Sequence, residues 1–107
     1  MATMAEGRIL IADDEDGLRW VLEKGFRGAG YQVTAVKDGT AALRESEAQP
    51  FDLILLDIRM PGIDGLTLLG QVREKRPDAQ VVIMTAHGTV ETAIQAMQRG
   101  AYDYLAK

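Results

Sequence analysis

Five polar side chains lie at or just past the ends of short apolar runs of the kind that form buried strands. Asp13 and Asp14 follow one such run, and Asp57, Thr85 and Lys107 each follow another. In an open parallel sheet, ligands bind at the carboxyl ends of the strands, so these groups are expected to converge on one rim. Carboxylates held close together repel one another, and some take up protons unless a cation neutralises them. The spacing therefore predicts a cation site at this rim.

A hard divalent cation with oxygen ligands suits such a site. Mg²⁺ keeps several waters and binds through one or two carboxylates. Asp57 is then able to act as a nucleophile and to form an aspartyl-phosphate. Lys107 is expected to neutralise one phosphoryl oxygen, and Thr85 is expected to donate a hydrogen bond to another. Since phosphoryl transfer depends mainly on positioning and electrostatics, these residue types predict a metal-assisted phosphoryl acceptor.

The elements that must position these groups begin with the apolar runs. Several of the runs are rich in β-branched or aromatic residues, which is typical of strands. Three are apolar almost throughout, as parallel strands covered on both faces are. The expected strands are Arg8–Ala12, Gln32–Val36, Leu53–Leu56, Gln80–Met84 and Tyr102–Leu105.

Helical periods lie between these runs. Apolar residues spaced at i, i+3, i+4 and i+7 predict the buried face of a helix. A weaker helix is expected from Asp38 to about Gln49, because Pro50 stops it. The resulting βαβαβαβαβ order predicts a parallel sheet with helices on both faces and right-handed crossovers. The three stripes expected to be buried are Leu18, Val21, Leu22, Gly25 and Phe26; Leu66, Leu69 and Val72; and Val90, Ala93, Ile94 and Met97.

The composition limits what such a chain can do. Its 107 residues fit one domain, and the lack of cysteine excludes disulfides and thiolate metal sites. A net charge of -4 without a run of Lys or Arg argues against direct contact with nucleic acid. No segment approaches the roughly 18 apolar residues of a membrane span. The first seven residues lack the features of a signal peptide, so a cytoplasmic location is expected by default.

Four stretches resemble the signatures of bacterial response-regulator receiver domains. They are ADDED (12–16), LLDIRMPGIDG (55–65), MTAHG (84–88) and GAYDYLAK (100–107). The resemblance covers residues 8–107 and leaves residues 1–7 as an N-terminal extension. DIRMPGIDG together with MTAHG is most similar to receivers of the nitrogen-regulator (NtrC) class, which stand ahead of ATPase and DNA-binding domains that activate sigma-54 transcription.

The resemblance implies a flavodoxin-like, doubly wound sheet of five parallel strands in the order 2-1-3-4-5. It also implies phosphorylation of Asp57 by a sensor histidine kinase or a small acyl phosphate. The Mg²⁺ site that it implies consists of Asp13, Asp14, Asp57 and the backbone carbonyl of Arg59. The family has five helices, whereas this sequence stops before the fifth. We therefore expect an uncovered apolar face and self-association, with a homodimer as its simplest form.

The resemblance also implies roles for residues near the phosphoryl group. Thr85 and Lys107 would hold the phosphoryl oxygens, and the inward or outward rotamer of Tyr104 would report phosphorylation. The output would be a conformational change that controls a transcriptional domain outside this chain. His87, the only histidine, is expected to be a solvated loop residue rather than a catalytic one. Trp20 falls opposite the apolar stripe of its helix, so it is expected to be partly exposed, either against a partner or by incidental packing.

Two other functions use related chemistry or topology. A phosphohydrolase of the haloacid-dehalogenase type places a second acid two residues after its nucleophile, and that position is Arg59 here. A flavin-binding module needs a phosphate cradle after the first strand, where Asp13 and Asp14 would repel phosphate. Both functions are therefore disfavoured. Asp64 and Asp103 are expected to be ordinary surface charges.

Overall fold

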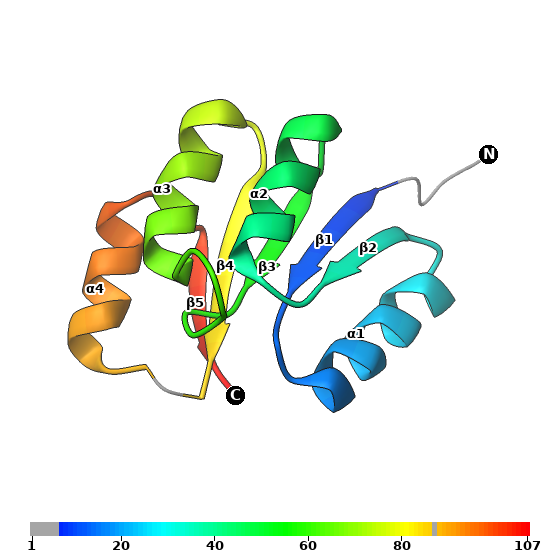
Figure 1. Cartoon of the computed structure of the whole chain (residues 1–107), viewed down its shortest axis with the longest axis horizontal. Coiled ribbons are helices and arrows are strands. Elements are labelled where there is room, and N and C mark those ends of the chain that lie inside the picture. The colour runs from blue at the N-terminus through cyan, green and yellow to red at the C-terminus, as the bar shows by residue number, and fades with distance from the viewer. Residues whose placement is uncertain (1–6, 87) are drawn as a thin grey trace.

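A single parallel sheet forms the centre of the computed structural model, which describes residues 7–86 and 88–107. Its strand order is β2-β1-β3-β4-β5, so the expected doubly wound α/β fold is confirmed (Figure 1). The described residues contain four helices and no fifth one. The elements are β1 (Arg8–Ala12), α1 (Asp16–Gly28), β2 (Gln32–Val36), α2 (Gly39–Ala48), β3 (Leu53–Leu56), α3 (Gly65–Lys75), β4 (Gln80–Thr85), α4 (Val90–Gln98) and β5 (Asp103–Ala106).

Two strands differ slightly from the sequence-based expectation. β4 continues one residue further, to Thr85, and β5 begins and ends one residue later than expected. Both changes follow from the ladder, because Thr85 pairs with Ala106 at its last rung. The N–H of Lys107 then donates to the carbonyl of Thr85 at 3.0 Å. The pairing therefore holds Lys107 beside the end of β4.

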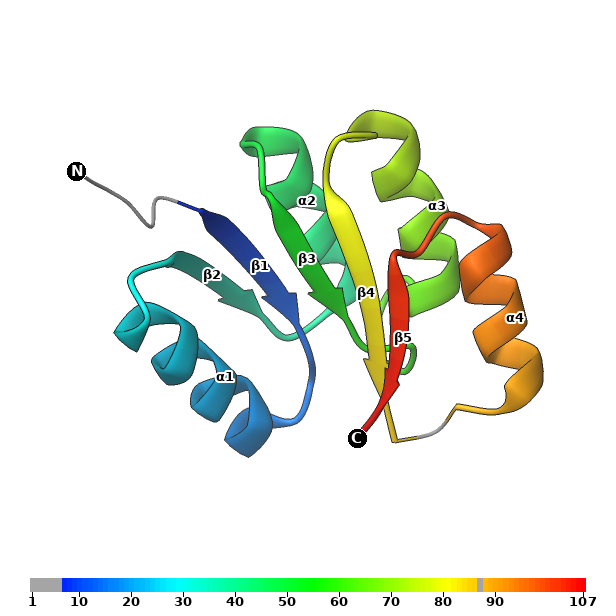
Figure 2. The same cartoon turned by 180° about the vertical axis from the view of Figure 1, so that it is seen from behind.

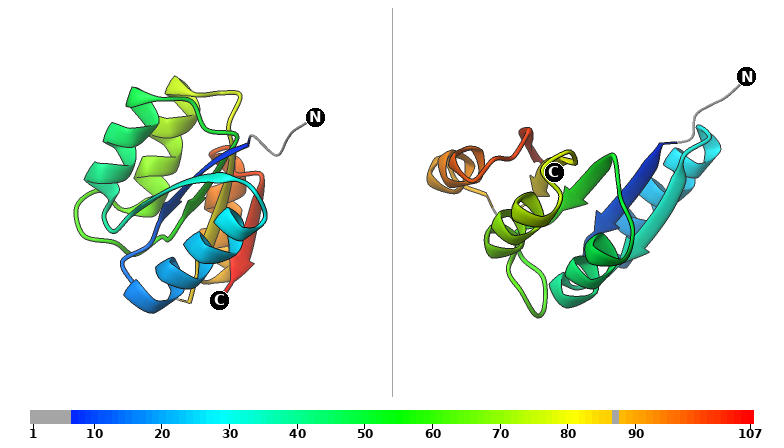
Figure 3. Two further views of the ribbon diagram at one scale, coloured as in Figure 1. Left: turned by 90° about the vertical axis from the view of Figure 1, so that its right-hand side faces the viewer. Right: turned by 90° about the horizontal axis from the view of Figure 1, so that it is seen from above.

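The sheet separates two apolar layers. Alternate residues of the central strands, such as Leu10 and Ile54, point to the side of α2 and α3, where the larger core cluster lies. Ile11 and Leu55 point to the opposite side, where α1 packs (Figure 3). α1 packs mainly on β1 and β2, and Figure 2 shows much of this face of the sheet without a helix over it. The two layers are therefore unequally covered in the described chain.

The buried stripe expected for α1 is only half correct. Leu22 and Phe26 pack against the smaller core cluster, but Val21 is 57% exposed. No residue of α1 is fully buried. The reason is that α1 lies on its side of the sheet without a neighbouring helix in the described residues, so only the sheet itself covers it.

The expectation for α4 is wrong, whereas that for α3 is confirmed. Leu69 and Val72 of α3 are fully buried. In α4 the buried residue is Ala96, while Val90, Ile94 and Met97 are 79%, 53% and 50% exposed. α4 lies at the β5 end of the sheet (Figure 1). There the small side chain of Ala96 is buried, and the large apolar side chains are exposed. Within the described residues, no helix is long and apolar enough to cross a membrane.

Candidate functional site

Asp13 and Asp57 lie side by side because the strands that precede them are hydrogen-bonded neighbours. Ala12 of β1 pairs with Leu56 of β3, so the next residue of each strand emerges at the same rim. The N–H of Asp57 donates to the carbonyl of Ala12 at 3.0 Å, and the N–H of Asp13 donates to Val36 at 3.1 Å. Both carboxylates are buried, with exposures of 1% and 4%. The register of the sheet therefore creates a buried pair of acids.

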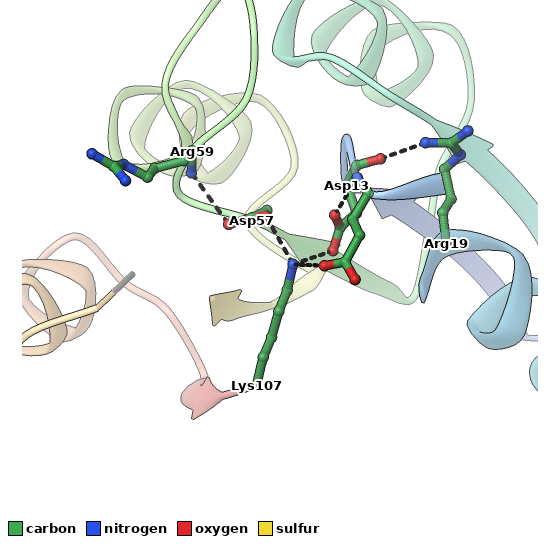
Figure 4. Close-up of polar contacts among 6 residues, drawn as sticks. Asp13, Arg19, Asp57, Arg59 and Lys107 are labelled. Atoms are coloured by element: carbon green, nitrogen blue, oxygen red, sulfur yellow. Dashed lines mark hydrogen bonds and ion pairs between the residues drawn. The ribbon is translucent and has the colours of Figure 1, made fainter. Parts of the chain in front are cut away.

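Lys107 provides the positive charge that this pair needs. Its Nζ lies 2.9 Å from Oδ2 of Asp57, to which it donates a hydrogen bond, and 2.8 Å from Oδ2 of Asp13 (Figure 4). The lysine side chain is only 12% exposed. Burial by itself lowers the pKa of the ammonium group, but the attraction of the two carboxylates outweighs burial, so the pKa of Lys107 lies above its ordinary value. Lys107 is therefore positively charged throughout the neutral range.

The same acids could also hold a cation. One oxygen each of Asp13, Asp14 and Asp57 lie within 4.8 Å of one another. Oδ2 of Asp13 is buried and lies against the ammonium group of Lys107 as an ion pair. Asp14 is exposed, so the cluster opens to solvent on one side. Three clustered carboxylate oxygens with open access suit a hard, partly hydrated divalent cation such as Mg²⁺.

Arg59 contributes backbone and not side chain to this region. Its N–H donates to Oδ1 of Asp57 at 3.2 Å, which orients the carboxylate. Its guanidinium is exposed and points away from the acids in Figure 4. The proposed coordination through the Arg59 carbonyl stays a prediction.

Thr85 and Lys107 share a pocket beside the acids. Thr85 is buried, with 1% exposure, at the last position of β4. The pocket has a volume of about 250 Å³, and its walls also include Ala86, Gly88 and Tyr104. Small residues at two of these positions leave space at the end of β4. The pocket is therefore large enough for a phosphoryl group, and both Thr85 and Lys107 contribute to its walls.

Tyr104 is half-buried and reaches toward α4. Its hydroxyl lies 3.0 Å from Oγ1 of Thr92, a contact that sequence reasoning missed. A side chain at Gly88 would overlap this hydroxyl, so the tyrosine lies directly against the backbone there. Tyr104 therefore connects the phosphoryl-sized pocket to the first turn of α4.

Arg19 is a second residue that sequence reasoning missed. It hydrogen-bonds to the backbone of Asp13 and to Asp16, three residues before it in α1. The i, i+3 spacing of opposite charges was the available signal for the second bond. Glu15 also approaches Lys107, at 3.5 Å.

The remaining expectations concern surface positions. Trp20 is 60% exposed as expected, and the ammonium of Lys24 lies 5.0 Å from its ring. Asp64 and Asp103 are exposed, and Asp64 also caps α3 through the N–H groups of Leu66 and Thr67. His87 lies outside the described residues.

The fold and the site define a class: flavodoxin-like α/β domains with an acidic cation site and a lysine at the carboxyl end of the sheet. The family described as "Response regulator receiver domain" matches residues 9–107. The NtrC transcriptional regulator of Escherichia coli K12 is 43% identical over 104 residues, which are 97% of this chain and 22% of that protein. The chain thus spans about a fifth of the length of the curated relatives it matches.

Two solved structures add chemical detail about related proteins. A Burkholderia pseudomallei response regulator with a phosphorylated aspartic acid and a calcium ion superposes with a TM-score of 0.91, at 30% identity over 95% of this chain and 60% of that one. The Thermotoga maritima response regulator TrrA in complex with Mg²⁺ and BeF gives a TM-score of 0.84, at 34% identity over 94% of this chain and 86% of that one. This chain belongs to the response-regulator receiver family and is a signalling switch domain.

Proposed function

We propose that this receiver domain accepts a phosphoryl group on Asp57 in a Mg²⁺-dependent reaction. The central position of Asp57 carries the proposal. β3 lies between β1 and β4, so Asp57 has Asp13 and Asp14 on one side and the end of β4, where the pocket of Thr85 and Lys107 lies, on the other. Asp13 follows β1, which is one strand further from β4 and the pocket than β3 is. Asp57 is therefore the carboxylate best placed to meet both a cation and a phosphoryl pocket.

The donor is a phosphohistidine of a sensor kinase or a small acyl phosphate. A carboxylate oxygen of Asp57 forms a bond to phosphorus while the bond from phosphorus to the donor nitrogen or oxygen breaks. Asp13, Asp14, Asp57 and the carbonyl of Arg59 would hold Mg²⁺, which when bound offsets the negative charge of the phosphoryl oxygens. Lys107 exchanges its hydrogen bond to Asp57 for one to a phosphoryl oxygen.

Phosphorylation then changes the balance between two conformations of the domain. The group adds a charge of about -1.5 to -2 and strong acceptors. These attract the hydroxyl of Thr85, which shares its pocket with Tyr104. Movement of the β4–α4 loop would release the Tyr104 contact with Thr92 and reposition α4. The output surface that changes is formed by the exposed apolar side chains of α4 and β5, and the change is a shift between pre-existing states.

The relatives support a proposal about the wider protein. We place the receiver at residues 8–107 with residues 1–7 as an extension, and we place a transcriptional output domain outside this chain. We assign DNA contact to that output domain. We also propose that the whole regulator acts in the cytoplasm and that this domain makes no contact with a membrane. The exposed groove of about 410 Å³ along α1, lined by Val21, Phe26 and Tyr31, supports self-association of this chain into a homodimer.

The proposal is tested by incubating the protein with acetyl phosphate and Mg²⁺ and measuring its intact mass. One added phosphoryl group is expected, with none in Asp57→Asn and none without the cation. Asp103→Asn removes an exposed carboxylate remote from the acids and should be labelled like the parent. Full labelling of Asp57→Asn would refute the assignment of the acceptor. Sustained release of phosphate from many equivalents of donor would favour a phosphohydrolase instead.

A further inference from the structure

Arg19 joins the acid pair to the first turn of α1 through two hydrogen bonds. Its Nη1 donates to the backbone carbonyl of Asp13 at 2.8 Å, and its Nη2 donates to Oδ1 of Asp16 at 2.6 Å. The side chain is only 20% exposed although it carries a charge. Figure 4 shows the guanidinium turned back from α1 toward Asp13. A largely buried guanidinium is therefore used to hold one backbone oxygen of the site.

The carbonyl that Arg19 holds belongs to the peptide group between Asp13 and Asp14. A peptide group is planar, so fixing its oxygen also fixes the position from which the backbone of Asp14 departs. Asp13 is buried and its N–H is bonded to Val36, whereas Asp14 is exposed. Arg19 therefore restrains the backbone that leads from the buried end of β1 to the exposed residue Asp14.

The N-terminal cap of α1 does not restrain the Asp13–Asp14 peptide. Glu15 is the N-cap residue, but its side chain accepts no hydrogen bond from the helix. Its N–H donates to Oδ1 of Asp13 at 2.9 Å, which orients the carboxylate of Asp13 and not that of Asp14. The contact that holds the carbonyl of the Asp13–Asp14 peptide thus comes from the guanidinium of Arg19.

We propose that Arg19 is a positioning residue for the Mg²⁺ site, acting through the Asp13–Asp14 peptide. This inference rests on the proposed function, since it assumes that these acids hold the cation. Carboxylates without a cation repel each other, and an untethered Asp14 would move away into solvent. Groups that orient metal ligands contribute to metal affinity, because less order has to be created on binding.

Arg27 provides a matched control within the same helix. Its Nη2 donates to the backbone carbonyl of Val33 at 3.0 Å, and its Nη1 pairs with Glu23 at 2.8 Å. It therefore makes the same two kinds of contact as Arg19, but at the opposite end of α1 from the acids. A variant of Arg27 therefore shows how the loss of these two kinds of contact changes the stability of the domain away from the acids.

The experiment measures Mg²⁺ binding by titration calorimetry, and thermal unfolding without Mg²⁺, for the parent, Arg19→Ala, Arg19→Lys and Arg27→Ala. Arg19→Ala is expected to weaken Mg²⁺ binding about 10-fold, while Arg27→Ala stays within about twofold of the parent. Arg19→Lys should lie in between, because an ammonium can hold the carbonyl but lacks the fork geometry. The Mg²⁺ concentration that half-saturates phosphorylation should rise in Arg19→Ala, with the rate at saturating Mg²⁺ unchanged.

The outcomes separate the inference from its premise. Parental affinity in Arg19→Ala, or an equal loss in Arg27→Ala, overturns the role of Arg19. If Arg19→Ala does not fold, Arg19→Lys decides: weaker Mg²⁺ binding supports the role, and parental binding overturns it. A parent protein that does not bind Mg²⁺ at all would instead overturn the proposed cation site.

Discussion

The hydroxyl of Tyr104 lies 3.0 Å from Oγ1 of Thr92, which joins β5 to the first turn of α4. The same Thr92 oxygen donates to the carbonyl of Thr89 at 2.9 Å and accepts from the N–H of Thr89 at 2.8 Å. Either hydroxyl can be the donor in the contact between Tyr104 and Thr92. The orientation of the tyrosine and the capping box of α4 are therefore coupled through one oxygen atom.

Replacing Thr92 tests this coupling. Thr92→Val keeps the shape of the side chain but removes the oxygen, so it should lower the free energy of unfolding by about 1 kcal/mol through the lost cap. It should also move the ring resonances of Tyr104 toward their positions in the phosphorylated parent, as measured by NMR. Thr92→Ser retains the hydroxyl and serves as the control. Unchanged Tyr104 resonances in Thr92→Val would show that the contact does not hold the ring.

A methyl group at Gly88 should displace Tyr104 directly. The Cβ of Gly88→Ala would overlap the tyrosine hydroxyl, so the ring has to move or the loop has to shift. We expect a lower melting temperature and altered Tyr104 resonances. Gly70→Ala in α3 is the control, because its Cβ meets no atom within 4 Å and alanine favours the helix by about 1 kcal/mol. Equal melting temperatures for the two variants would contradict the close approach.

Lys107 should stabilise the domain most when no cation is present. Lys107→Met leaves Asp13 and Asp57 buried without their counter-ion, which should cost roughly 3 kcal/mol in Mg²⁺-free buffer by denaturant titration. Mg²⁺ should then stabilise this variant more than it stabilises the parent. Lys75→Met is the control, since Lys75 pairs with Glu47 while half exposed. An equal effect of Mg²⁺ on Lys107→Met and the parent would contradict a shared role in neutralisation.

The contribution of Lys107 should also depend on pH in a defined direction. Its pKa in the folded state is raised above the ordinary value of 10.5. The stabilisation is therefore complete below about pH 10.5 and decreases as the pH rises toward the folded pKa. The difference in unfolding free energy between the parent and Lys107→Met should stay constant from neutral pH to that point and shrink above it. If the difference in unfolding free energy already shrinks near neutral pH, the pKa of Lys107 is not raised and the ion pairs with the two acids do not form.

Removing Asp14 should reduce the response to Mg²⁺. A cation that binds only the folded state raises the melting temperature, and the rise grows with the ratio of cation concentration to dissociation constant. Calorimetry in millimolar Mg²⁺ should show a clear shift for the parent and a much smaller one for Asp14→Asn. Asp78→Asn removes the same charge from an exposed loop position and should respond like the parent. Equal shifts in Asp14→Asn and the parent would place the cation elsewhere.

The sequence by itself determined the strands, their alternation with helices and the rim on which the acids meet. Short apolar runs such as Leu53–Leu56 are typical of parallel strands covered on both faces, and the residue after each strand lies at its carboxyl end. The convergence of Asp13, Asp57 and Lys107 was therefore predictable without knowledge of any distance.

Only the tertiary structure decided which apolar stripes are covered and which side chains meet across elements. Periodicity identifies the apolar side of α4, but burial depends on what packs there, and Ala96 is buried instead of Ile94. The contacts of Arg19 with Asp13 and of Tyr104 with Thr92 depend on side-chain directions and on how each helix sits at the sheet. Hydrophobic burial is non-directional, so a sequence pattern can favour an apolar surface without specifying its partner.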